Sequence, residues 1–176
     1  MAILYTIGHS TRSLGELIEA LQAHGIKTLV DIRAFPMSRR HPHFNRENLE
    51  QELPKVGIEY VWQKDLGGHR KKQLENSPNT ALRNDSFRNY ADYMLTPQFQ
   101  TAAAEVRQLA ERQRTAIMCA ERVWFHCHRM MVSDYYTAHG DTVEHIDATG
   151  PTRRHTLMKE AHMVDGKLLY NAGQLF

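Results

Sequence analysis

The chain has 176 residues, of which 41% are hydrophobic and 24% charged, and its formal net charge is +2. These are the values of a folded domain with a sizeable core, because a disordered chain has fewer apolar residues and a larger net charge. The small net charge also excludes a general attraction of the whole molecule to nucleic acid or to a membrane surface. We therefore expect one α/β domain over residues 1–176.

No apolar run approaches the ~20 residues that a membrane-spanning helix requires, and the N-terminal residues lack the basic and apolar regions of a secretory signal. Two cysteines in a chain of this size do not make a disulfide scaffold, so we expect thiols that stay reduced. The sequence therefore predicts a cytoplasmic protein without a membrane partner.

The first part of the chain predicts a strand, a helix and a second strand. An apolar run over residues 3–7 is followed by Ser13 and Glu16, which have the spacing of a capping box, and by apolar residues at helical spacing up to Gly25. Residues 28–33 then have the pattern of a second strand. These three elements form a βαβ unit, in which the strands are parallel and the crossover is right-handed.

The remaining elements continue this alternation. Pro54 is expected to end the first of the helices that follow, since proline lacks the amide proton that a helix interior needs. The predicted elements are a loop at 34–44, a helix at 46–53, a strand at 58–62, a long loop at 64–85, helices at 86–94 and 97–112, a strand at 115–119, a helix at 127–139, a strand at 142–146, and an edge strand or hairpin at 166–170. The alternation predicts a Rossmann-like, doubly wound α/β fold, a mostly parallel sheet of about five strands flanked by helices.

Reactive or ionisable residues follow each clear parallel strand of this prediction. Ligands of open parallel sheets bind beyond the carboxyl ends of the strands, where such residues would meet. A scaffold alone does not need them, because turns can be built from glycine, asparagine and proline. The residues concerned are His9 and Ser10 after the first strand, Asp31 and Arg33 at the second, Cys119 and Glu121 at the fourth, and Asp147 at the fifth.

Asp31 and Arg33 lie on the same face of the second predicted strand, because side chains alternate along a strand. One interpretation is a strand-end ion pair, in which Asp31 has only a structural role. The other is a general base or a ribose anchor, kept ionised by nearby arginines, which would need desolvation to act as a base near neutral pH. Both interpretations fit the sequence.

Residues 33–46 contain four arginines and two histidines and no carboxylate. Guanidinium groups bind phosphate and carboxylate through two parallel hydrogen bonds, and Phe35 and Phe44 lie among them as in surfaces that stack bases. A second basic cluster, residues 69–72, follows two glycines. Two such clusters favour an anionic ligand, although a solvated basic loop over an edge of the sheet would have the same composition.

The segment from Cys119 to Arg129 is the densest in reactive residues. Cys127 is expected at or near a helix N-terminus, where the macrodipole and Arg129 stabilise a thiolate. Three interpretations are open: a nucleophilic or redox thiol with His126 or His128 as its base, a metal site that includes Cys119, and small buried packing residues. For Cys119, which follows two apolar residues, packing is favoured, and the spacing of the two cysteines matches no standard metal-ligand motif.

Several short motifs in order resemble one known family. They are Gly8-His9-Ser10-Thr11, Val30-Asp31-Ile32-Arg33 with Phe35-Pro36 and Ser38-Arg39, Phe44-Asn45, Leu66-Gly67-Gly68, and Cys119-Ala120-Glu121 with Cys127-His128-Arg129. Through them the chain, from near its N-terminus to about Asp147, resembles the family called domain of unknown function 488. The resemblance implies a small prokaryotic cytosolic protein and marks as site residues His9, Ser10, Asp31, Arg33, Arg39, Asn45, Glu121, Cys127, His128 and Arg129. Residues 124–126 look bulkier than the family pattern, which would narrow a pocket.

We expect an enzyme that acts on a phosphate-bearing substrate, an anionic small molecule or a nucleic-acid end, as a hydrolase or transferase with no cofactor specified. The expected catalytic residues are His9, Asp31, Glu121 and Cys127, and the expected substrate-binding residues are Ser10, Arg33, Arg39, Arg40, Asn45, Arg70, His128 and Arg129. The alternatives are a non-catalytic nucleic-acid-binding module that uses both basic loops, and a metal or redox site of Cys119, Cys127 and His128. The near-neutral total charge favours the enzyme.

Overall fold

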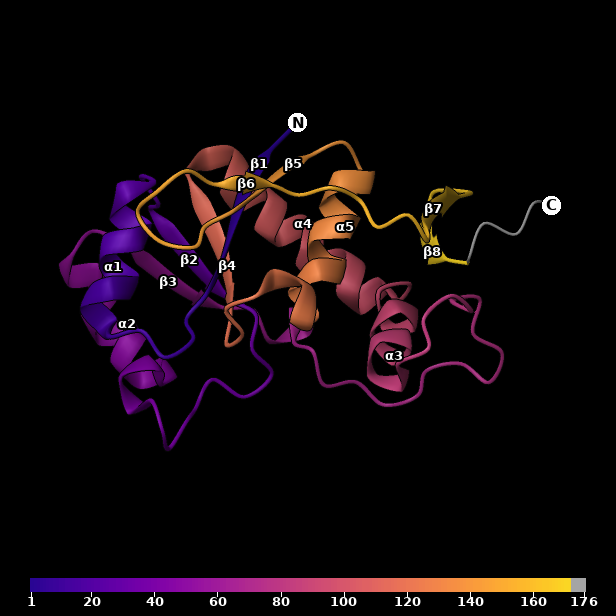
Figure 1. The fold of residues 1–176 in the computed structure, drawn as a ribbon, viewed down its shortest axis with the longest axis horizontal. Helices are drawn as coiled ribbons and strands as arrows, with labels where there is room; N and C mark the ends of the chain where they lie inside the picture. The colour runs from indigo at the N-terminus through magenta and orange to yellow at the C-terminus, as the bar shows by residue number, and fades with distance from the viewer. Residues whose placement is uncertain (172–176) are drawn as a thin grey trace.

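The computed structural model describes residues 1–171, and a six-stranded sheet lies at its centre (Figure 1). The strands of this sheet are β1 (Ile3–Gly8), β2 (Thr28–Asp31), β3 (Glu59–Trp62), β4 (Thr115–Cys119), β5 (Thr142–His145) and β6 (Arg153–Arg154). Their order is β3-β2-β4-β1-β5-β6, and neighbours are parallel except for the pair β5 and β6. A separate antiparallel hairpin consists of β7 (Ala161–Val164) and β8 (Lys167–Tyr170).

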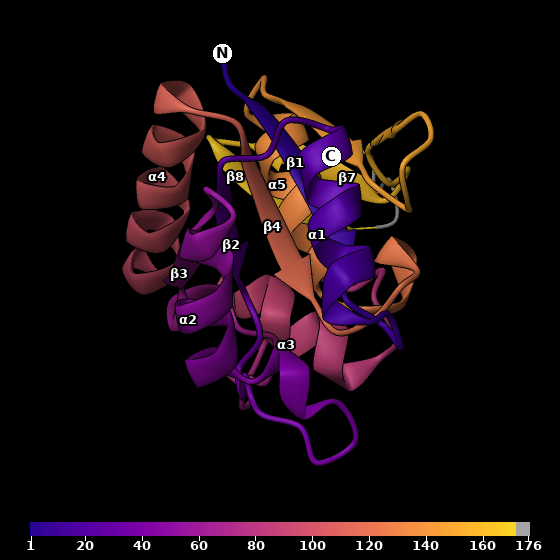
Figure 2. The ribbon, with the colours of Figure 1, turned by 90° about the vertical axis from the view of Figure 1, so that its left-hand side faces the viewer.

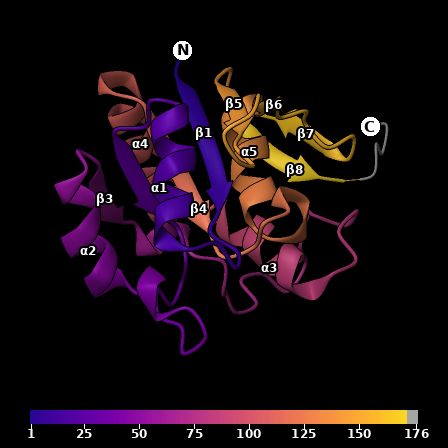
Figure 3. The same ribbon diagram turned by 60° about the vertical axis from the view of Figure 1, so that its left-hand side comes forward.

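Helices cover both faces of the sheet (Figures 2 and 3). On one face lie α1 (Leu14–Ala23) and α2 (Arg46–Lys55), and on the other lie α4 (Pro97–Arg112) and α5 (Arg129–Ala138). Helix α3 (Asp85–Tyr93) lies beyond the carboxyl ends of the strands, near the start of α5. Over residues 1–171, none of the helices combines the length and the apolar character needed to cross a bilayer.

Each face of the sheet has its own apolar core, because neighbouring residues of a strand point to opposite faces. Leu29 and Met118 pack with α1 and α2, whereas their neighbours Val30 and Ile117 pack with α4 and α5. All four side chains are fully buried. This double burial explains why these strands are continuous apolar runs in the sequence, as in other parallel sheets that are covered on both faces.

The direction of the crossovers explains where the helices lie. From β1 through β2 to β3 the chain moves toward one edge of the sheet, and from β3 to β4 and on to β5 it moves back. Right-handed crossovers in opposite directions place their helices on opposite faces. The adjacent strands β1 and β4 therefore send their connections to opposite faces, which opens a crevice at their carboxyl ends. Because β4 lies between β2 and β1, the order differs from the 3-2-1-4-5-6 order of dinucleotide-binding folds.

The predicted mostly parallel α/β sheet with flanking helices is confirmed, and so is the capping box of α1. In that box the Ser13 hydroxyl accepts from the Glu16 amide at 3.1 Å, and the Glu16 carboxylate accepts from the Ser13 amide at 2.8 Å. The predicted edge element near residues 166–170 is the second strand of the hairpin. The predicted domain of residues 1–176 includes residues 172–176, which lie outside the described part of the chain.

Four details of the prediction were wrong. Helix α2 extends to Lys55, because a proline in the last turn disturbs only one hydrogen bond, and Pro54 therefore does not end it. Strand β2 ends at Asp31, whose carboxylate accepts from the amide two residues later and turns the chain away. Helix α5 begins at Arg129, since Cys127 is extended with a φ of −142°. Within residues 1–171 the central sheet has six strands rather than about five, because the two-residue β6 joins its edge.

The connection that leaves β4 crosses over the end of β1 in direct contact with Gly8. A Cβ atom on residue 8 would lie 1.7 Å from the carbonyl oxygen of Glu121, so only glycine fits at this position. The amides of the next two residues donate to the carbonyls of Cys119 and Ala120, both at 2.9 Å. The crossing therefore fixes the start of the segment that joins β4 to α5.

Replacing Gly8 with alanine should lower the free energy of unfolding by at least about 3 kcal/mol, because the added methyl group meets backbone atoms that cannot move aside. Gly15→Ala is the matched control, since a Cβ there has its nearest neighbour at 3.9 Å and its stability should stay within about 1 kcal/mol of wild type. Urea unfolding followed by circular dichroism measures both variants. Equal stability of Gly8→Ala and wild type would contradict the crossing.

Candidate functional site

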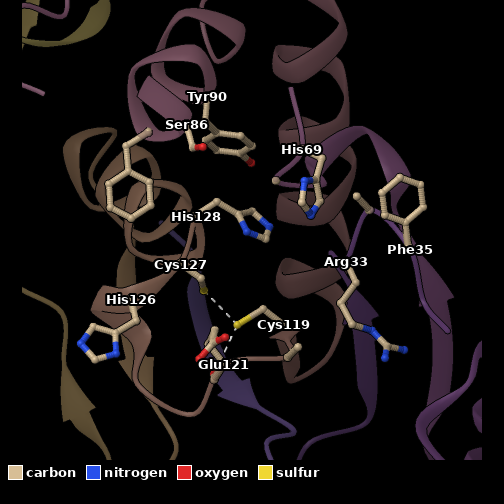
Figure 4. Close-up of a pocket in the computed structure, with 14 residues that line it drawn as sticks. Arg33, Phe35, His69, Ser86, Tyr90, Cys119, Glu121, His126, Cys127 and His128 are labelled. Atoms are coloured by element: carbon tan, nitrogen blue, oxygen red, sulfur yellow. Dashed lines mark hydrogen bonds between the residues drawn. The ribbon is translucent and has the colours of Figure 1, made fainter. Parts of the chain in front are cut away.

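A cavity of about 430 Å³ opens beyond the carboxyl ends of β2 and β4, and we call it the central cavity (Figure 4). Its walls are formed by the segments that follow β2, β3 and β4, by the start of α5, and by Ser86 and Tyr90 of α3. Only some of the site residues predicted from strand ends line this cavity. The central cavity is lined, among others, by Arg33, His69, Cys119, Glu121, His126, Cys127 and His128.

Two sulfur atoms meet on one wall of the central cavity (Figure 4). The Sγ atoms of Cys119 and Cys127 lie 3.0 Å apart, and both thiols are free. Cys119 ends β4 and is only 2% exposed, whereas Cys127 precedes α5 and is partly exposed. The packing role predicted for Cys119 is confirmed by its place in the core. Its contact with Cys127 could not be read from the sequence, because it depends on the path of the segment between them.

The two thiols hold their protons differently. Hydrogen bonding with Cys119 lowers the pKa of Cys127 well below that of an ordinary thiol, and His128 and Arg129 act in the same direction against the effect of burial. Burial raises the pKa of Cys119, so Cys119 keeps its proton, and both the Cys127 sulfur and the Glu121 carbonyl, at 3.4 Å, lie within hydrogen-bond distance of its S–H. The amide of Arg129, the first residue of α5, also donates to that sulfur at 3.4 Å. These contacts favour the thiolate form of Cys127 near the N-terminal end of α5.

His128 is a fixed neighbour of Cys127 in the wall of the central cavity. Its Nε2 donates to the carbonyl of Ile32 at 3.0 Å, which fixes the orientation of the ring. A Cβ at Gly68 would lie 2.6 Å from Nδ1, so glycine lets the imidazole pack against the backbone. The ring of Tyr90 meets the imidazole edge-on, with 5.1 Å between the centroids.

Glu121 lies where the central cavity meets a second cavity, which His9, Ser10 and Arg33 also line. Among the described residues that line either cavity, Glu121 is the one carboxylic acid, and its side chain is exposed. Ser10 has a φ of 51°, in the left-handed region that residues other than glycine rarely adopt. Such strained residues cluster at functional sites, which favours this edge of the sheet as the site.

His9 lines the second cavity, but both of its ring nitrogens are engaged. Burial lowers the pKa of His9 to about 4, so the ring is neutral at physiological pH. Nδ1 donates to the carbonyl of Ser10 at 3.0 Å, and Nε2 accepts from Nη1 of Arg33 at 3.3 Å. The ring also packs on Phe44 with 4.4 Å between the centroids. In this state His9 positions Arg33.

Asp31 and Arg33 form a buried ion pair with two parallel hydrogen bonds. Nε of Arg33 donates to Oδ1 at 2.9 Å and Nη2 donates to Oδ2 at 2.6 Å, while the hydroxyl of Tyr60 donates to Oδ2 at 2.5 Å. Asp31 is completely buried and lines neither cavity. This geometry matches the structural interpretation of Asp31. Tyr60 was missed by sequence reasoning, because only the pairing of β3 with β2 brings it to Asp31.

Five predicted substrate-binding residues, one of them Arg129, lie outside the walls of both cavities. Arg39 and Arg40 are exposed in the loop between β2 and α2. Asn45 accepts a hydrogen bond of 2.6 Å from an amide of the same loop and thereby shapes it. The guanidinium of Arg70 stacks over the ring of Tyr93 at 3.8 Å and donates to two backbone carbonyls. His69, the neighbour of Arg70, lines the central cavity instead.

Arg129 is 1% exposed and lies beneath the segment between β4 and α5. Its Nη2 donates to the carbonyls of Glu121 at 3.2 Å and Arg122 at 2.9 Å, and its Nη1 donates to the hydroxyl of Thr6 at 3.3 Å. All three partners are neutral oxygen atoms, so the guanidinium keeps its full positive charge close to Cys127. Arg129 lines a separate cavity of about 240 Å³ and not the central one.

A buried polar network behind Arg129 was also not visible in the sequence. Asp134 and His155 are joined at 2.7 Å, His155 and His145 at 2.9 Å, and His145 and Thr6 at 2.5 Å, and Thr6 in turn accepts from Arg129. Burial lowers the pKa of His145 to about 3, so its ring is neutral. The network links α5 and β5 to Arg129, and it is formed only when both elements pack on β1.

The donor atoms at this edge do not form a metal-binding set. Within residues 1–171, no group of three or more His, Cys, Asp or Glu side chains is arranged to hold a metal ion. Nε2 of His128 is used by the carbonyl of Ile32, away from the two sulfur atoms. Of the bulky residues 124–126, His126 lines the central cavity, whereas Trp124 stacks on His145 with 4.5 Å between the centroids.

One family model matches residues 13–136, more than half of the chain, and it is described as Domain of unknown function DUF488. The chain belongs to this family. The matched range contains Glu121 and Cys127. It begins after His9 and Ser10, so the assignment of these two residues to the family rests only on the sequence motif that contains them. No curated protein and no solved structure matches the chain. Membership of DUF488 specifies no reaction, so the function follows from the site alone.

Alkylation by iodoacetamide should select Cys127, because it lines the central cavity as a thiolate, whereas Cys119 is buried and protonated. The rate should stay nearly constant from pH 8 to pH 6. Alkylation of an ordinary thiol would slow roughly 75-fold over this interval, because its thiolate fraction decreases as the pH drops further below its usual pKa. Mass spectrometry of the alkylated peptides measures the rate, with Cys127→Ser as the control. A rate that falls like that of an ordinary thiol would contradict the thiolate assignment.

Proposed function

We propose that this DUF488 protein is a thiol-dependent enzyme of the cytoplasm, a hydrolase or transferase in which Cys127 attacks a phosphate-bearing substrate. The observation that carries the proposal is the position of Cys127 on the wall of the central cavity, with its sulfur 3.0 Å from that of Cys119 and with contacts that lower its pKa. A depressed thiol pKa beside open space for a substrate is the arrangement of an activated nucleophile. Cytoplasmic thiols stay reduced, which such a nucleophile requires.

The reaction begins when the Cys127 sulfur attacks phosphorus. A sulfur–phosphorus bond forms, the bond to the leaving oxygen breaks, and that oxygen takes a proton. Glu121 borders the central cavity as its one carboxylic acid among the described residues, so it is placed to give this proton. The carboxylate then accepts a proton from the water or hydroxyl group that displaces Cys127, and the Cys119 thiol again stabilises the released thiolate.

Basic groups around the central cavity support an anionic substrate, nucleotide-like or the end of a nucleic acid. Arg33, His69 and His126 line this cavity, with Glu121 as the acidic member among the described residues. Asp31 neutralises most of the charge of Arg33. The two histidines and the exposed arginines of the loop between β2 and α2 are therefore the groups that attract the anion.

Turnover should depend on Cys127 and Glu121, while binding should not. In a screen of 5′-nucleotides, 5′-phosphorylated oligonucleotides and para-nitrophenyl phosphate, Cys127→Ser should abolish phosphate release, and Glu121→Gln should slow it by about 10² to 10⁴. Calorimetry should show substrate affinity within about threefold of wild type for both variants. Glu19→Gln, on the exposed side of α1, is the control and should leave turnover unchanged. Wild-type turnover in Cys127→Ser would overturn the proposal.

A non-catalytic nucleic-acid-binding module is the second candidate, and one observation favours it. Phe35 is 72% exposed and Met37 is 68% exposed, next to the exposed Arg39 and Arg40. The ring of Phe35 lies 5.5 Å from that of His69 at the central cavity. Exposed aromatic and arginine side chains on one loop are typical of surfaces that stack bases and bind phosphates of single strands.

If this loop binds single-stranded nucleic acid, the double variant Arg39→Ala/Arg40→Ala should bind a fluorescent oligonucleotide more weakly. Its plot of log affinity against log salt concentration should lose about 1.4 from the slope, for two phosphate contacts. Lys27→Ala is the matched control, since Lys27 is exposed at the opposite end of β2 and should not change the slope. Binding that does not respond to salt would exclude this candidate. Binding without turnover of any screened substrate would favour it over the enzyme.

A further inference from the structure

We propose that Cys119 and Cys127 form a reversible disulfide bond when a peroxide oxidises Cys127. The inference rests on the juxtaposition of the two free sulfur atoms, 3.0 Å apart on the wall of the central cavity (Figure 4). A disulfide bond is about 2.05 Å long, so its formation needs an approach of about 1 Å. Its effect on activity rests on the proposed function, whereas its formation does not.

The two cysteines differ in exposure, which sets the order of events. Cys127 lines an open cavity and is partly exposed, so a small peroxide reaches its sulfur first. Cys119 also borders this cavity but is only 2% exposed and belongs to the core, so its sulfur is the less accessible of the two. The chain contains two cysteines, so Cys119 is the one partner that the same molecule offers for an oxidised Cys127.

The disulfide bond forms in two steps, oxidation of Cys127 and attack by Cys119. The Cys127 thiolate attacks the peroxide oxygen, the O–O bond breaks, and the departing alkoxide or hydroxide takes a proton, which leaves a sulfenic acid on Cys127. The sulfur of Cys119 then attacks the Cys127 sulfur, the S–O bond breaks, and the leaving hydroxide takes the Cys119 proton as water. Two thiols are oxidised by two electrons in total, and one peroxide is reduced to water and an alcohol, or to two waters.

The segment that the bond would close is suited to this movement. Cys119 is the last residue of β4, whereas Cys127 lies in extended conformation between η3 (Trp124–His126) and α5, so only the second sulfur is carried by irregular structure. The intervening residues are largely exposed at positions 120–122 and at 125 and 126. A small shift of Cys127 toward β4 therefore does not require the sheet to move.

The disulfide would remove the nucleophile and would protect it at the same time. A Cys127 sulfenic acid without a partner is oxidised further to sulfinic acid, which ordinary thiols do not reduce. Capture by Cys119 stops that oxidation, and a dithiol such as dithiothreitol restores both thiols by exchange. The proposed activity would thus be switched off by peroxide and recovered by reductant.

Peptide mapping of the intact wild-type protein after treatment with hydrogen peroxide tests the inference. A peptide pair that joins Cys119 to Cys127, lighter by two hydrogen atoms and separated by dithiothreitol, is the expected product. Sulfinic acid on Cys127 without this linked pair would overturn it, and so would a linkage found only between two molecules.

Two variants report on the order of the steps. In Cys119→Ser the sulfenic acid of Cys127 should persist, react with dimedone and proceed to sulfinic acid. In Cys127→Ser, Cys119 should remain a thiol, because its sulfur is almost completely buried; a sulfenic acid on Cys119 would contradict the order. Activity is measured separately on the reduced wild type. A linked pair in a protein without turnover would refute the proposed function alone, and turnover without a linked pair would refute this inference alone.

Discussion

The contact between Gly8 and the carbonyl of Glu121 is the constraint on which the site depends. Strands β1 and β4 are neighbours, and the connection that leaves β4 crosses over the end of β1 before it reaches α5. No side chain lies between this connection and β1, because a Cβ at residue 8 would overlap that carbonyl. The segment after β4 is thereby placed against β1 at its first turn, and Cys127 reaches the end of β4 from the start of α5.

The electrostatics of the site follow from what lies beneath this segment. Arg129 is buried with neutral oxygen partners, and a buried cation without a counter-ion is costly. The thiolate of Cys127, which Arg129 helps to stabilise, supplies a compensating negative charge. Asp31 and Arg33, by contrast, neutralise each other at the end of β2. The reactive charge of the site is therefore on sulfur, and the strongest ion pair nearby is structural.

The sequence predicted the strand ends as the place of the site, because periodicity locates parallel strands and their carboxyl ends share one edge. It also placed Asp31 and Arg33 on one face of a strand, with an ion pair as one of two interpretations, and it favoured the burial of Cys119, since both inferences depend on strand alternation and local apolar pattern. The strand order, with β4 between β2 and β1, depends on long-range pairing that local pattern does not encode. For the same reason, local pattern could not predict that the Arg33 guanidinium is held in the interior by Asp31, or that the two sulfur atoms lie together.

The contacts of the loop arginines could not be predicted from composition. Composition assigned Arg39 and Arg40 to one basic cluster and Arg70 to a second, but composition does not report what each guanidinium contacts. The Arg70 guanidinium stacks on Tyr93 and donates to two backbone carbonyls, whereas Arg39 and Arg40 are exposed. Family membership in DUF488 does not separate these cases either, because it carries no residue roles. Only the geometry distinguishes a cation that shapes a loop from one that is available to a ligand.

A crystal structure of the reduced protein with orthovanadate tests the central claim, that Cys127 is a nucleophile facing a site for a phosphoryl group, most directly. Vanadate adopts the five-coordinate geometry of phosphoryl transfer and bonds to an attacking sulfur. The predicted result is vanadium bonded to Sγ of Cys127 inside the central cavity, with Glu121 beside an apical oxygen. Vanadate bound elsewhere, with an unmodified Cys127 facing an empty cavity, would contradict the account.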